Sequence, residues 1–325
     1  MVIAFLNFRK GDGHMRFLIT GGLGHIGSKL IRELAVYPHT QHICVLDNFS
    51  SQRYNSLFHL PKGNYEFIEG DVLDENILIK AMENVDVVIH LAAITDAPST
   101  FANPALVKQV NEFGTQKVVD MAIQKGVKRF IYPSTTSVYG PTEGIAREDC
   151  SEEDLKPQSP YAETKLAGEK ITLNAYQNYG LPSTVFRLGT IFGPSPGMRF
   201  HTAINKFIFL ACTNKPLTVW DSAVHLKRPY LDLRDAVKSF LFALEHRETI
   251  GETFNVVTLN AGIGEITDAI KRYVPNLQIA YTKNPLLNQM SYFTDDTKIK
   301  NLGFTYLGNL DEGVKETIHY LRGLL

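Results

Sequence analysis

Hydrophobic residues in the first 190 positions form short continuous runs, separated by longer stretches with helical periodicity. The runs are mostly apolar throughout rather than alternating, which is the pattern of strands buried on both faces. Strands of this kind alternating with helices predict a parallel sheet with helices on both sides. The predicted strands are residues 16–20, 42–47, 65–70, 85–92, 129–135 and 183–188, and the predicted helices include 26–36, 74–83, 104–125 and 161–179.

The pattern loosens after about residue 190, where "FGPSPGMRF" has loop composition. A helical stretch at 202–214, a strand at 217–220, a helix from near Asp235, a strand at 252–257 and a helix from Leu310 follow. We therefore expect an α/β protein: a Rossmann-type doubly wound parallel sheet over residues 15–189, and a smaller C-terminal α/β substrate domain over 190–325. Segments near 230–260 are expected to return to the first domain. Residues 1–14 are interpreted as an extension or a cloning remnant.

Composition narrows the class of function. The 325 residues are 44% hydrophobic, which is enough for a sizeable core, and no run of 18 apolar residues predicts a membrane span. A net charge of −1 gives no electrostatic reason to expect nucleic acid or an anionic membrane as partner. Cys44, Cys150 and Cys212 are too far apart for a CxxC metal site and odd in number, so we expect no metal and a reducing, cytoplasmic compartment.

A glycine-rich turn follows the first predicted strand. In "TGGLGHIGSKL", Gly21, Gly24 and Gly27 form GxxGxxG, with a strand before it and a helix after it. Glycine allows a tight turn and close approach of backbone N–H groups to a ligand, and the helix directs its positive end to the same place. This arrangement favours the pyrophosphate of a dinucleotide.

Asp47 ends the second predicted strand, 20 residues after Gly27. A carboxylate there can accept both ribose hydroxyls of an adenosine and would repel a 2′-phosphate, which favours NAD over NADP. The alternative is that Asp47 only caps a turn.

Tyr161 and Lys165 lie four residues apart in "SPYAETKLAGEK" and share one face of a predicted helix. By itself the pair means little, because a chain of this composition contains about one such pair by chance. The chemistry would nevertheless suit catalysis. A free phenol ionises near about pH 10, and a neighbouring ammonium would lower its pKa so that it can act as a base near neutrality.

Several ordered motifs together resemble a known family: "TGGLGHIG", "GDVLD" at 70–74, "HLAA" at 90–93, "VNEFGT" at 110–115, "PSTTSVYG" at 133–140, "YAETK" at 161–165 and "RPYLDLRDA" at 228–236. They resemble the extended short-chain dehydrogenases/reductases, and within them the NAD-dependent nucleotide-sugar epimerase/dehydratase family of the UDP-glucose 4-epimerase type. The resemblance implies bound NAD, catalysis by Thr135, Tyr161 and Lys165, and a homodimer through residues 104–125 and 161–179. "STTS" offers four hydroxyls, so satisfying backbone groups is the alternative role for Thr135.

By position, the resemblance also assigns residues to ligands. Asn111 would support the active site, and Gly114 in the same helix is explained by close packing against a neighbour. The resemblance also implies a nucleotide sugar as substrate, most often a UDP-sugar, which would be bound by Thr135, Thr190 and Arg228. The implied cofactor-binding residues are Gly21, Gly24, His25, Ile26, Gly27, Asp47, Asn48, Asp71, Val72, Leu91, Ala92, Ala93, Asn111, Tyr161 and Lys165.

Family members oxidise a sugar carbon and then diverge. In 4,6-dehydratases an Asp–Glu pair follows the catalytic Thr, whereas this chain has Thr136 and Ser137. We therefore expect epimerisation through a transient keto-sugar. A 4,6-dehydratase, an NAD(P)H-dependent nucleotide-sugar reductase and a non-catalytic cofactor sensor are the alternatives.

The substrate side departs from the family pattern at two positions. Thr190 stands where relatives often have Asn, and Pro229 where they have Asp. Residues 198–207, "MRFHTAINKF", would cover the nucleotide, although a core-facing amphipathic helix explains their apolar side chains equally well.

Overall fold

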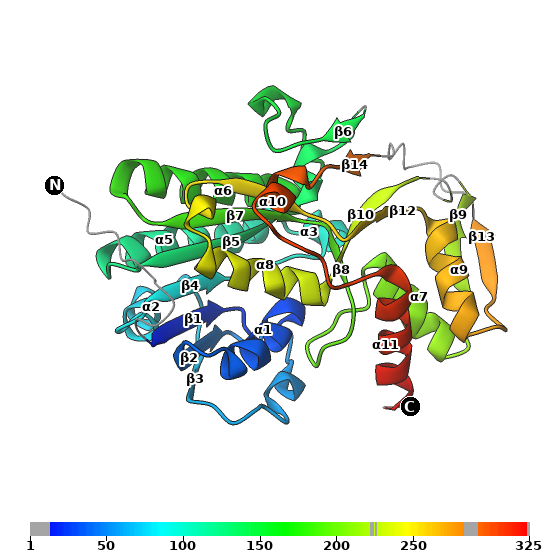
Figure 1. The fold of residues 1–325 in the computed structure, drawn as a ribbon, viewed down its shortest axis with the longest axis horizontal. Coiled ribbons are helices and arrows are strands. Elements are labelled where there is room, and N and C mark those ends of the chain that lie inside the picture. The colour runs from blue at the N-terminus through cyan, green and yellow to red at the C-terminus, as the bar shows by residue number, and fades with distance from the viewer. Residues whose placement is uncertain (1–13, 143, 222–223, 225, 283–291, 324–325) are drawn as a thin grey trace.

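The structure is a computed structural model, and it describes residues 14–142, 144–221, 224, 226–282 and 292–323. Its largest element is a seven-stranded sheet in the order β3-β2-β1-β4-β5-β7-β11, parallel throughout (Figure 1). The strands are β1 (Met15–Thr20), β2 (Thr40–Asp47), β3 (Tyr65–Glu69), β4 (Val87–His90), β5 (Arg129–Thr135), β7 (Ser183–Leu188) and β11 (Thr253–Val256).

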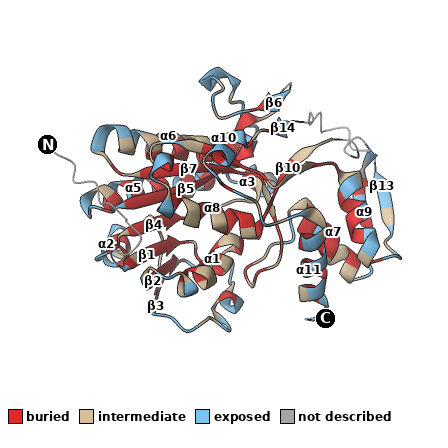
Figure 2. Ribbon diagram, viewed as in Figure 1, coloured by how far each residue is buried: buried red, intermediate tan, exposed pale blue. Residues whose placement is uncertain are grey.

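Helices cover both faces of this sheet, so the prediction of a doubly wound parallel sheet is confirmed. On one face α1 (His25–Val36) packs against α8 (Leu233–Glu245), and both share a core with β1, β7 and β11. The other face carries α2 (Glu75–Ala81), α5 (Gly114–Gln124) and α6 (Pro160–Tyr179). Figure 2 shows the central strands buried and the outer faces of the helices exposed. Burial on both faces explains why the strand sequences are apolar throughout.

A second group of helices lies at one end of the molecule (Figure 1). Helices α7 (Ala203–Cys212), α9 (Ile263–Tyr273) and α11 (Leu310–Arg322) share a separate core. The small sheets are β8 (Thr190–Phe192) with β10 (Arg228–Asp232) and β12 (Leu259–Ala261), then β9 (Leu217–Trp220) with β13 (Ile279–Thr282), and β6 (Ile145–Ala146) with β14 (Phe293–Thr294). Short helices are α3 (Ala97–Thr100), α4 (Pro104–Lys108) and α10 (Thr297–Asn301), and 3-10 turns lie at Tyr54–Leu57, Thr136–Tyr139, Glu152–Asp154 and Arg247–Thr249.

Two segments differ from or refine the sequence predictions. The helix predicted over 104–125 is interrupted by a π-helical turn at Gln109–Phe113, between α4 and α5. The segment near 230–260 contributes to both parts of the molecule, because β10 and β12 lie in a small sheet while α8 and β11 join the large one.

Candidate functional site

The turn between β1 and α1 is too crowded for side chains. A Cβ added to Gly21 would lie 2.6 Å from the Ala92 nitrogen, and one added to Gly27 would lie 2.4 Å from the Gly22 oxygen. Gly21 also has a φ of 65°, in the left-handed region that favours glycine. The first turn of α1 holds no acidic residue, so its positive end is not neutralised there. The turn therefore suits the close approach of an anionic group such as a phosphate.

Asp47 ends β2 beside this turn. Its carboxylate accepts hydrogen bonds from the backbone N–H groups of Leu23 (3.1 Å) and Phe49 (3.0 Å), which fixes its position. Next to it, the Asn48 side-chain amide donates to Asp71 at 2.9 Å and so links the loops that follow β2 and β3. Asp47 therefore does accept backbone hydrogen bonds in the turn, as the alternative interpretation held, and its ribose-binding role stays a prediction.

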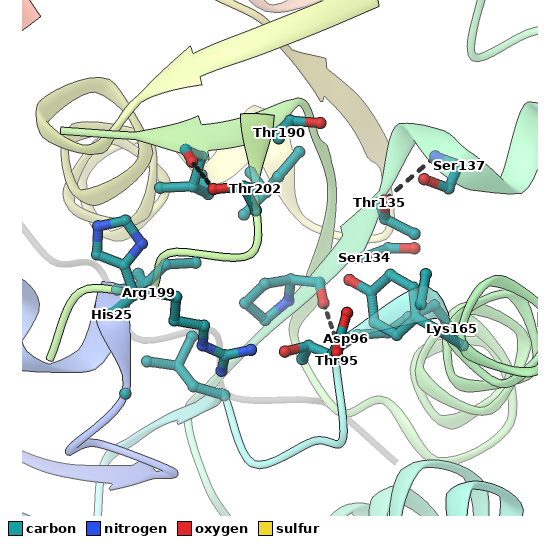
Figure 3. Close-up of a pocket in the computed structure, with 18 of the residues that line it drawn as sticks. His25, Thr95, Asp96, Ser134, Thr135, Ser137, Lys165, Thr190, Arg199 and Thr202 are labelled. Atoms are coloured by element: carbon teal, nitrogen blue, oxygen red, sulfur yellow. Dashed lines mark hydrogen bonds between the residues drawn. The ribbon is translucent and has the colours of Figure 1, made fainter. Parts of the chain in front are cut away.

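Tyr161 and Lys165 lie on α6, and Thr135 ends β5. The helix begins at a local signal: the Ser159 side chain caps it and Pro160 takes its first position. Tyr161 is partly buried, Thr135 is 8% exposed and Lys165 is 5% exposed. The Thr135 hydroxyl accepts from the Ser137 N–H at 3.1 Å. Figure 3 shows Thr135, Ser134 and Lys165 on one side of a cavity, with His25, Arg199 and Thr202 on the other.

Burial and neighbouring groups act on the pKa of Tyr161 in opposite directions. Burial raises its pKa, while the charge of Arg199 and the hydrogen bond with Thr135 lower it. Lys165 does not appear among these influences on the Tyr161 pKa, so the expectation that it lowers this pKa stays a prediction. Lys165 donates to the Pro133 carbonyl at 2.7 Å and lies 4.6 Å from the centre of the Tyr132 ring. Burial lowers the pKa of Lys165 to about 7, against the opposing charge of Glu169.

A buried polar network supports the same helix. Glu169, one turn after Lys165, forms an ion pair with Arg187 of β7 at 2.8 Å and accepts from the Ser134 hydroxyl. Arg187 also donates to the Tyr139 hydroxyl at 3.0 Å, which donates to Asn255 of β11 at 2.8 Å. The ion pair and its hydrogen bonds join α6 to β5, β7 and β11 beneath the catalytic candidates.

Asn111 holds the loop after β4 in place. Its side-chain amide exchanges hydrogen bonds with both backbone groups of Ile94 (2.8 and 2.9 Å) and donates to Thr164 of α6 at 3.1 Å. The nearby Gly114 is needed for close packing, as predicted, because a Cβ there would lie 3.0 Å from the Val72 side chain.

His90 at the end of β4 is wholly buried. Its ring nitrogens contact the hydroxyls of Thr20 (2.7 Å) and Thr115 (3.0 Å), and Thr20 accepts from the Ala92 N–H. Burial lowers the pKa of His90 to about 3, so this ring is neutral. Its two hydrogen bonds connect β1, β4 and α5.

A cavity of about 280 Å³ lies between the glycine turn and the catalytic candidates. It brings together ten of the predicted residues: Gly21, Gly24, His25, Ile26, Gly27, Leu91, Thr135, Tyr161, Lys165 and Thr190. The predicted residues Asp47, Asn48, Asp71, Val72, Ala92, Ala93, Asn111 and Arg228 do not line it. Asp47 ends β2, and the others except Arg228 lie in the segments that follow β2, β3 and β4. Arg228 lies on β10, with its guanidinium 5.0 Å from the Tyr292 ring.

The cavity also holds residues that the sequence analysis did not single out as ligands: Thr95, Asp96, Arg199, His201 and Thr202. Asp96 is its one carboxylate among the described residues. Arg199, His201 and Thr202 come from "MRFHTAINKF", and the structure divides this stretch in two. Its first half lines the cavity, and from Ala203 onward its apolar side chains serve the core through α7.

Within the described ranges, no group of three or more His, Cys, Asp and Glu side chains is arranged to hold a metal ion. Within the same ranges, no helix combines the length and the apolar character that a membrane span requires.

Comparisons with known proteins agree on one family. Its model, the NAD dependent epimerase/dehydratase family, matches residues 17–257. A dTDP-D-glucose 4,6-dehydratase of Mus musculus is 30% identical over 96% of this chain and 90% of its own length. A trifunctional UDP-glucose 4,6-dehydratase/UDP-4-keto-6-deoxy-D-glucose 3,5-epimerase/UDP-4-keto-L-rhamnose-reductase of Arabidopsis thaliana is 31% identical over 93% of this chain. The chain spans only 46% of that plant relative's length.

Among solved structures, a UDP-glucuronic acid 4-epimerase of Bacillus cereus, in complex with UDP-glucuronic acid and NAD, superposes with a TM-score of 0.87. It is 26% identical, and the match covers 96% of this chain and 100% of that one. The relatives therefore include both dehydratases and epimerases.

Proposed function

The chain belongs to the NAD-dependent epimerase/dehydratase family, and from that premise we propose that it epimerises a nucleotide sugar through a transient keto-sugar. The observation that carries the proposal is the cavity itself. It sets Tyr161 and Thr135 opposite the glycine turn and has no pair of carboxylic acids after Thr135.

NAD is the cofactor of the family, and the residues of this site fit it. The crowded glycines and the unneutralised end of α1 suit its pyrophosphate, and Asp47 suits a ribose. When bound, NAD supplies the acceptor and donor of hydride for one sugar carbon. The roles of Tyr161 and Lys165 at its nicotinamide end are part of this proposal.

The residues of the chain transfer the proton of the sugar hydroxyl and position the sugar. Tyr161 removes the proton of the sugar hydroxyl as the carbon is oxidised, and it returns the proton as the carbon is reduced. Thr135 hydrogen-bonds the phenol and can hold the same sugar hydroxyl. Lys165 is buried and anchored to the Pro133 carbonyl, from which it can reach a cofactor ribose. Inversion requires the keto-sugar to turn before reduction, and the residues need supply no second acid.

A dehydration reaction would need further acid–base groups in the site. Elimination of water calls for an acid and a base beyond the phenol, yet Thr136 is buried and Ser137 has only a hydroxyl. Asp96 is the single carboxylate among the described cavity residues, so the cavity holds no acid–base pair of carboxylic acids. A 4,6-dehydratase is nevertheless the second candidate, because the mouse relative is named as one.

We propose a UDP-sugar as substrate, supported by the UDP-glucuronic acid bound to the Bacillus cereus structure. Thr190 at the cavity would contact it, and Arg228 would meet its diphosphate only if the substrate extends beyond the cavity lining to β10. A homodimer through α4, α5 and α6 and a cytoplasmic location are further parts of the proposal. Exposed Leu106 and Phe113 on the first of these helices and the turn after it support the dimer.

The test is a screen of UDP-, GDP-, dTDP- and CDP-sugars without added cofactor, read by proton NMR. An epimerase yields the epimer of one sugar, and the nucleotide stays attached. A 4-keto-6-deoxy product would instead establish dehydration. A reaction that proceeds only with added NADPH would establish a reductase, and NAD binding with no turnover of any sugar would establish a sensor.

A further inference from the structure

Two arginines converge on the glycine turn. A Cβ built on Gly24 would lie 3.8 Å from Nη1 of Arg53 and 3.9 Å from Nη2 of Arg199. Arg53 immediately precedes the 3-10 turn at Tyr54–Leu57, whereas Arg199 comes from the loop after β8, far away in the sequence. Figure 3 shows the Arg199 side chain extending into the cavity. Both guanidinium groups therefore reach the place where the turn would receive an anion.

Neither positive charge is matched by a nearby carboxylate. Within the described ranges, no Asp or Glu oxygen lies within 4.0 Å of either guanidinium, and the buried Nε of Arg199 has no hydrogen-bond partner. Each arginine also repels the other, because the charge of Arg53 lowers the pKa of Arg199. Asp47 raises the pKa of Arg53, and Asp96 and Asp47 raise that of Arg199, but none of these carboxylates lies within 4.0 Å of the guanidinium groups. Two like charges held together without a counterion favour the binding of an anion between them.

The loop that carries Arg199 is fastened to the turn. His25 contacts the Gly193 carbonyl at 2.8 Å, Ser195 donates to the His25 carbonyl at 2.9 Å, and the Gly197 N–H donates to the Ser28 hydroxyl at 3.0 Å. Gly197 packs so closely that a Cβ would lie 2.5 Å from the Gly24 oxygen. The approach of Arg199 to the turn is therefore fixed by backbone and side-chain hydrogen bonds at the base of its loop.

We propose that Arg53 and Arg199 clamp the pyrophosphate of NAD against the N-terminus of α1. The two phosphates carry two negative charges, and each guanidinium can neutralise one of them with hydrogen bonds. The clamp makes retention of the cofactor depend on a residue of the loop after β8, which also lines the sugar end of the cavity. The proposal rests on NAD binding and not on epimerisation, so it stands or falls separately from the reaction.

The diphosphate of the sugar nucleotide is the other anion with this chemistry, and the experiment separates the two. Binding of ADP-ribose and of adenosine is measured by calorimetry on the full chain after its nucleotide is removed. Binding of UDP is measured on the NAD-loaded protein. The variants are Arg53→Gln, Arg199→Gln and Arg199→Lys. Arg272→Gln, on the exposed face of α9, is the matched control.

We expect each glutamine variant to weaken ADP-ribose binding by about 10- to 100-fold, the range of a charge-assisted hydrogen bond. Adenosine, which lacks the phosphates, should bind within about twofold of the unmodified protein, Arg199→Lys should fall between, and Arg272→Gln should change nothing. Equal losses for adenosine and ADP-ribose would mean a general structural defect and would overturn the proposal. Unchanged ADP-ribose binding would overturn it too, and if UDP binding fell at the same time, Arg199 would belong to the substrate.

Discussion

In the proposed reaction, the phenol of Tyr161 exchanges a proton near neutral pH, although burial raises its pKa. The charge of Arg199, which lies across the cavity rather than one helical turn away, counters this effect and lowers the pKa of Tyr161. Lys165 is buried against the Pro133 carbonyl. Its pKa of about 7 makes its charge sensitive to whatever binds beside it. The two groups that lower the pKa of Tyr161, Arg199 and Thr135, thus come from distant parts of the chain.

Replacing Tyr161 with Phe tests the acid/base role. Turnover should fall by about 100- to 10,000-fold, the usual contribution of a positioned acid/base, while the amount of NAD bound per chain stays the same. Product formation by NMR and the absorbance of released NAD measure the two quantities. Turnover within about threefold of the unmodified enzyme would contradict the assignment.

His90 predicts an acid-sensitive fold. Its pKa is about 3 when folded and 6.5 when unfolded, so below pH 6.5 the unfolded chain binds a proton that the folded chain does not. Stability is therefore lost as the pH falls, by about 2 kcal/mol for this group between pH 6.5 and pH 5. Urea unfolding of the protein at several pH values measures the slope of the unfolding free energy against pH.

In the same experiment, His90→Gln should flatten the slope, even though it also lowers stability at pH 7. The control is His319→Gln at the exposed end of α11, which should leave the slope unchanged. Identical slopes for the unmodified protein and His90→Gln would contradict the prediction.

At the scale of elements, α6 carries Tyr161, Lys165 and Glu169 at intervals of four residues on one face. The first two could be predicted from the family resemblance of the motif that holds them, because their spacing alone occurs about once by chance in a chain of this composition. Glu169 could not, since its partner Arg187 lies on β7 and only the folded sheet brings them to 2.8 Å. Spacing predicts contacts along one helix, whereas contacts between elements require the topology.

Glu169→Gln tests how strongly this ion pair joins α6 to β7. Both side chains are buried, so the substitution leaves the Arg187 charge uncompensated and should cost about 3–5 kcal/mol of unfolding free energy. The neighbouring Lys170 pairs with Glu152 on the surface, and Lys170→Gln should cost less than about 1 kcal/mol. Urea unfolding of both variants measures the difference, and equal costs would contradict the buried role.

Site residues could be predicted where the signal is local in the sequence, and not where a contact between distant elements brings them to the site. The glycine turn follows its strand directly and precedes a helix, so its spacing together with this local context predicts phosphate binding. Arg199 reaches this turn from the loop after β8, and nothing in "GPSPGMRF" shows which way the chain folds back. Asp96 was missed because a single acid after a strand is a weak signal. The π-helical turn at Gln109–Phe113 was also missed, because hydrophobic periodicity does not distinguish it from a continuous helix.

At the scale of the whole molecule, the cavity lies between residues of the large sheet and its helices and the segment from β8 to the start of α7. The hydrogen bonds of Ser28, Ser195 and Gly197 join the two parts beside the cavity. The order of strands and helices was predicted because continuous apolar runs and helical periodicity are local. How the segment near 230–260 divides between the sheets was only partly predictable, since it depends on long-range pairing.

The proposed homodimer can be tested at Phe113, which is 52% exposed on the helical face that would form the interface. Phe113→Glu should raise the dimer dissociation constant by about tenfold or more, because a charge replaces an apolar contact. Phe58→Glu is the control, since Phe58 is 61% exposed beside the 3-10 turn at Tyr54–Leu57. Sedimentation equilibrium measures both, and an unmodified protein that is monomeric, or equal effects of the two substitutions, would contradict the interface.

The central claim is that the sugar is oxidised and reduced at a single carbon while Tyr161 moves only a hydroxyl proton. It is tested most directly by proton NMR of the product formed in D₂O from the nucleotide sugar that the screen identifies. The account predicts an epimer whose inverted carbon keeps its original hydrogen, because the phenol exchanges only the hydroxyl proton with solvent. Deuterium on a ring carbon, or a 4-keto-6-deoxy sugar, would contradict it.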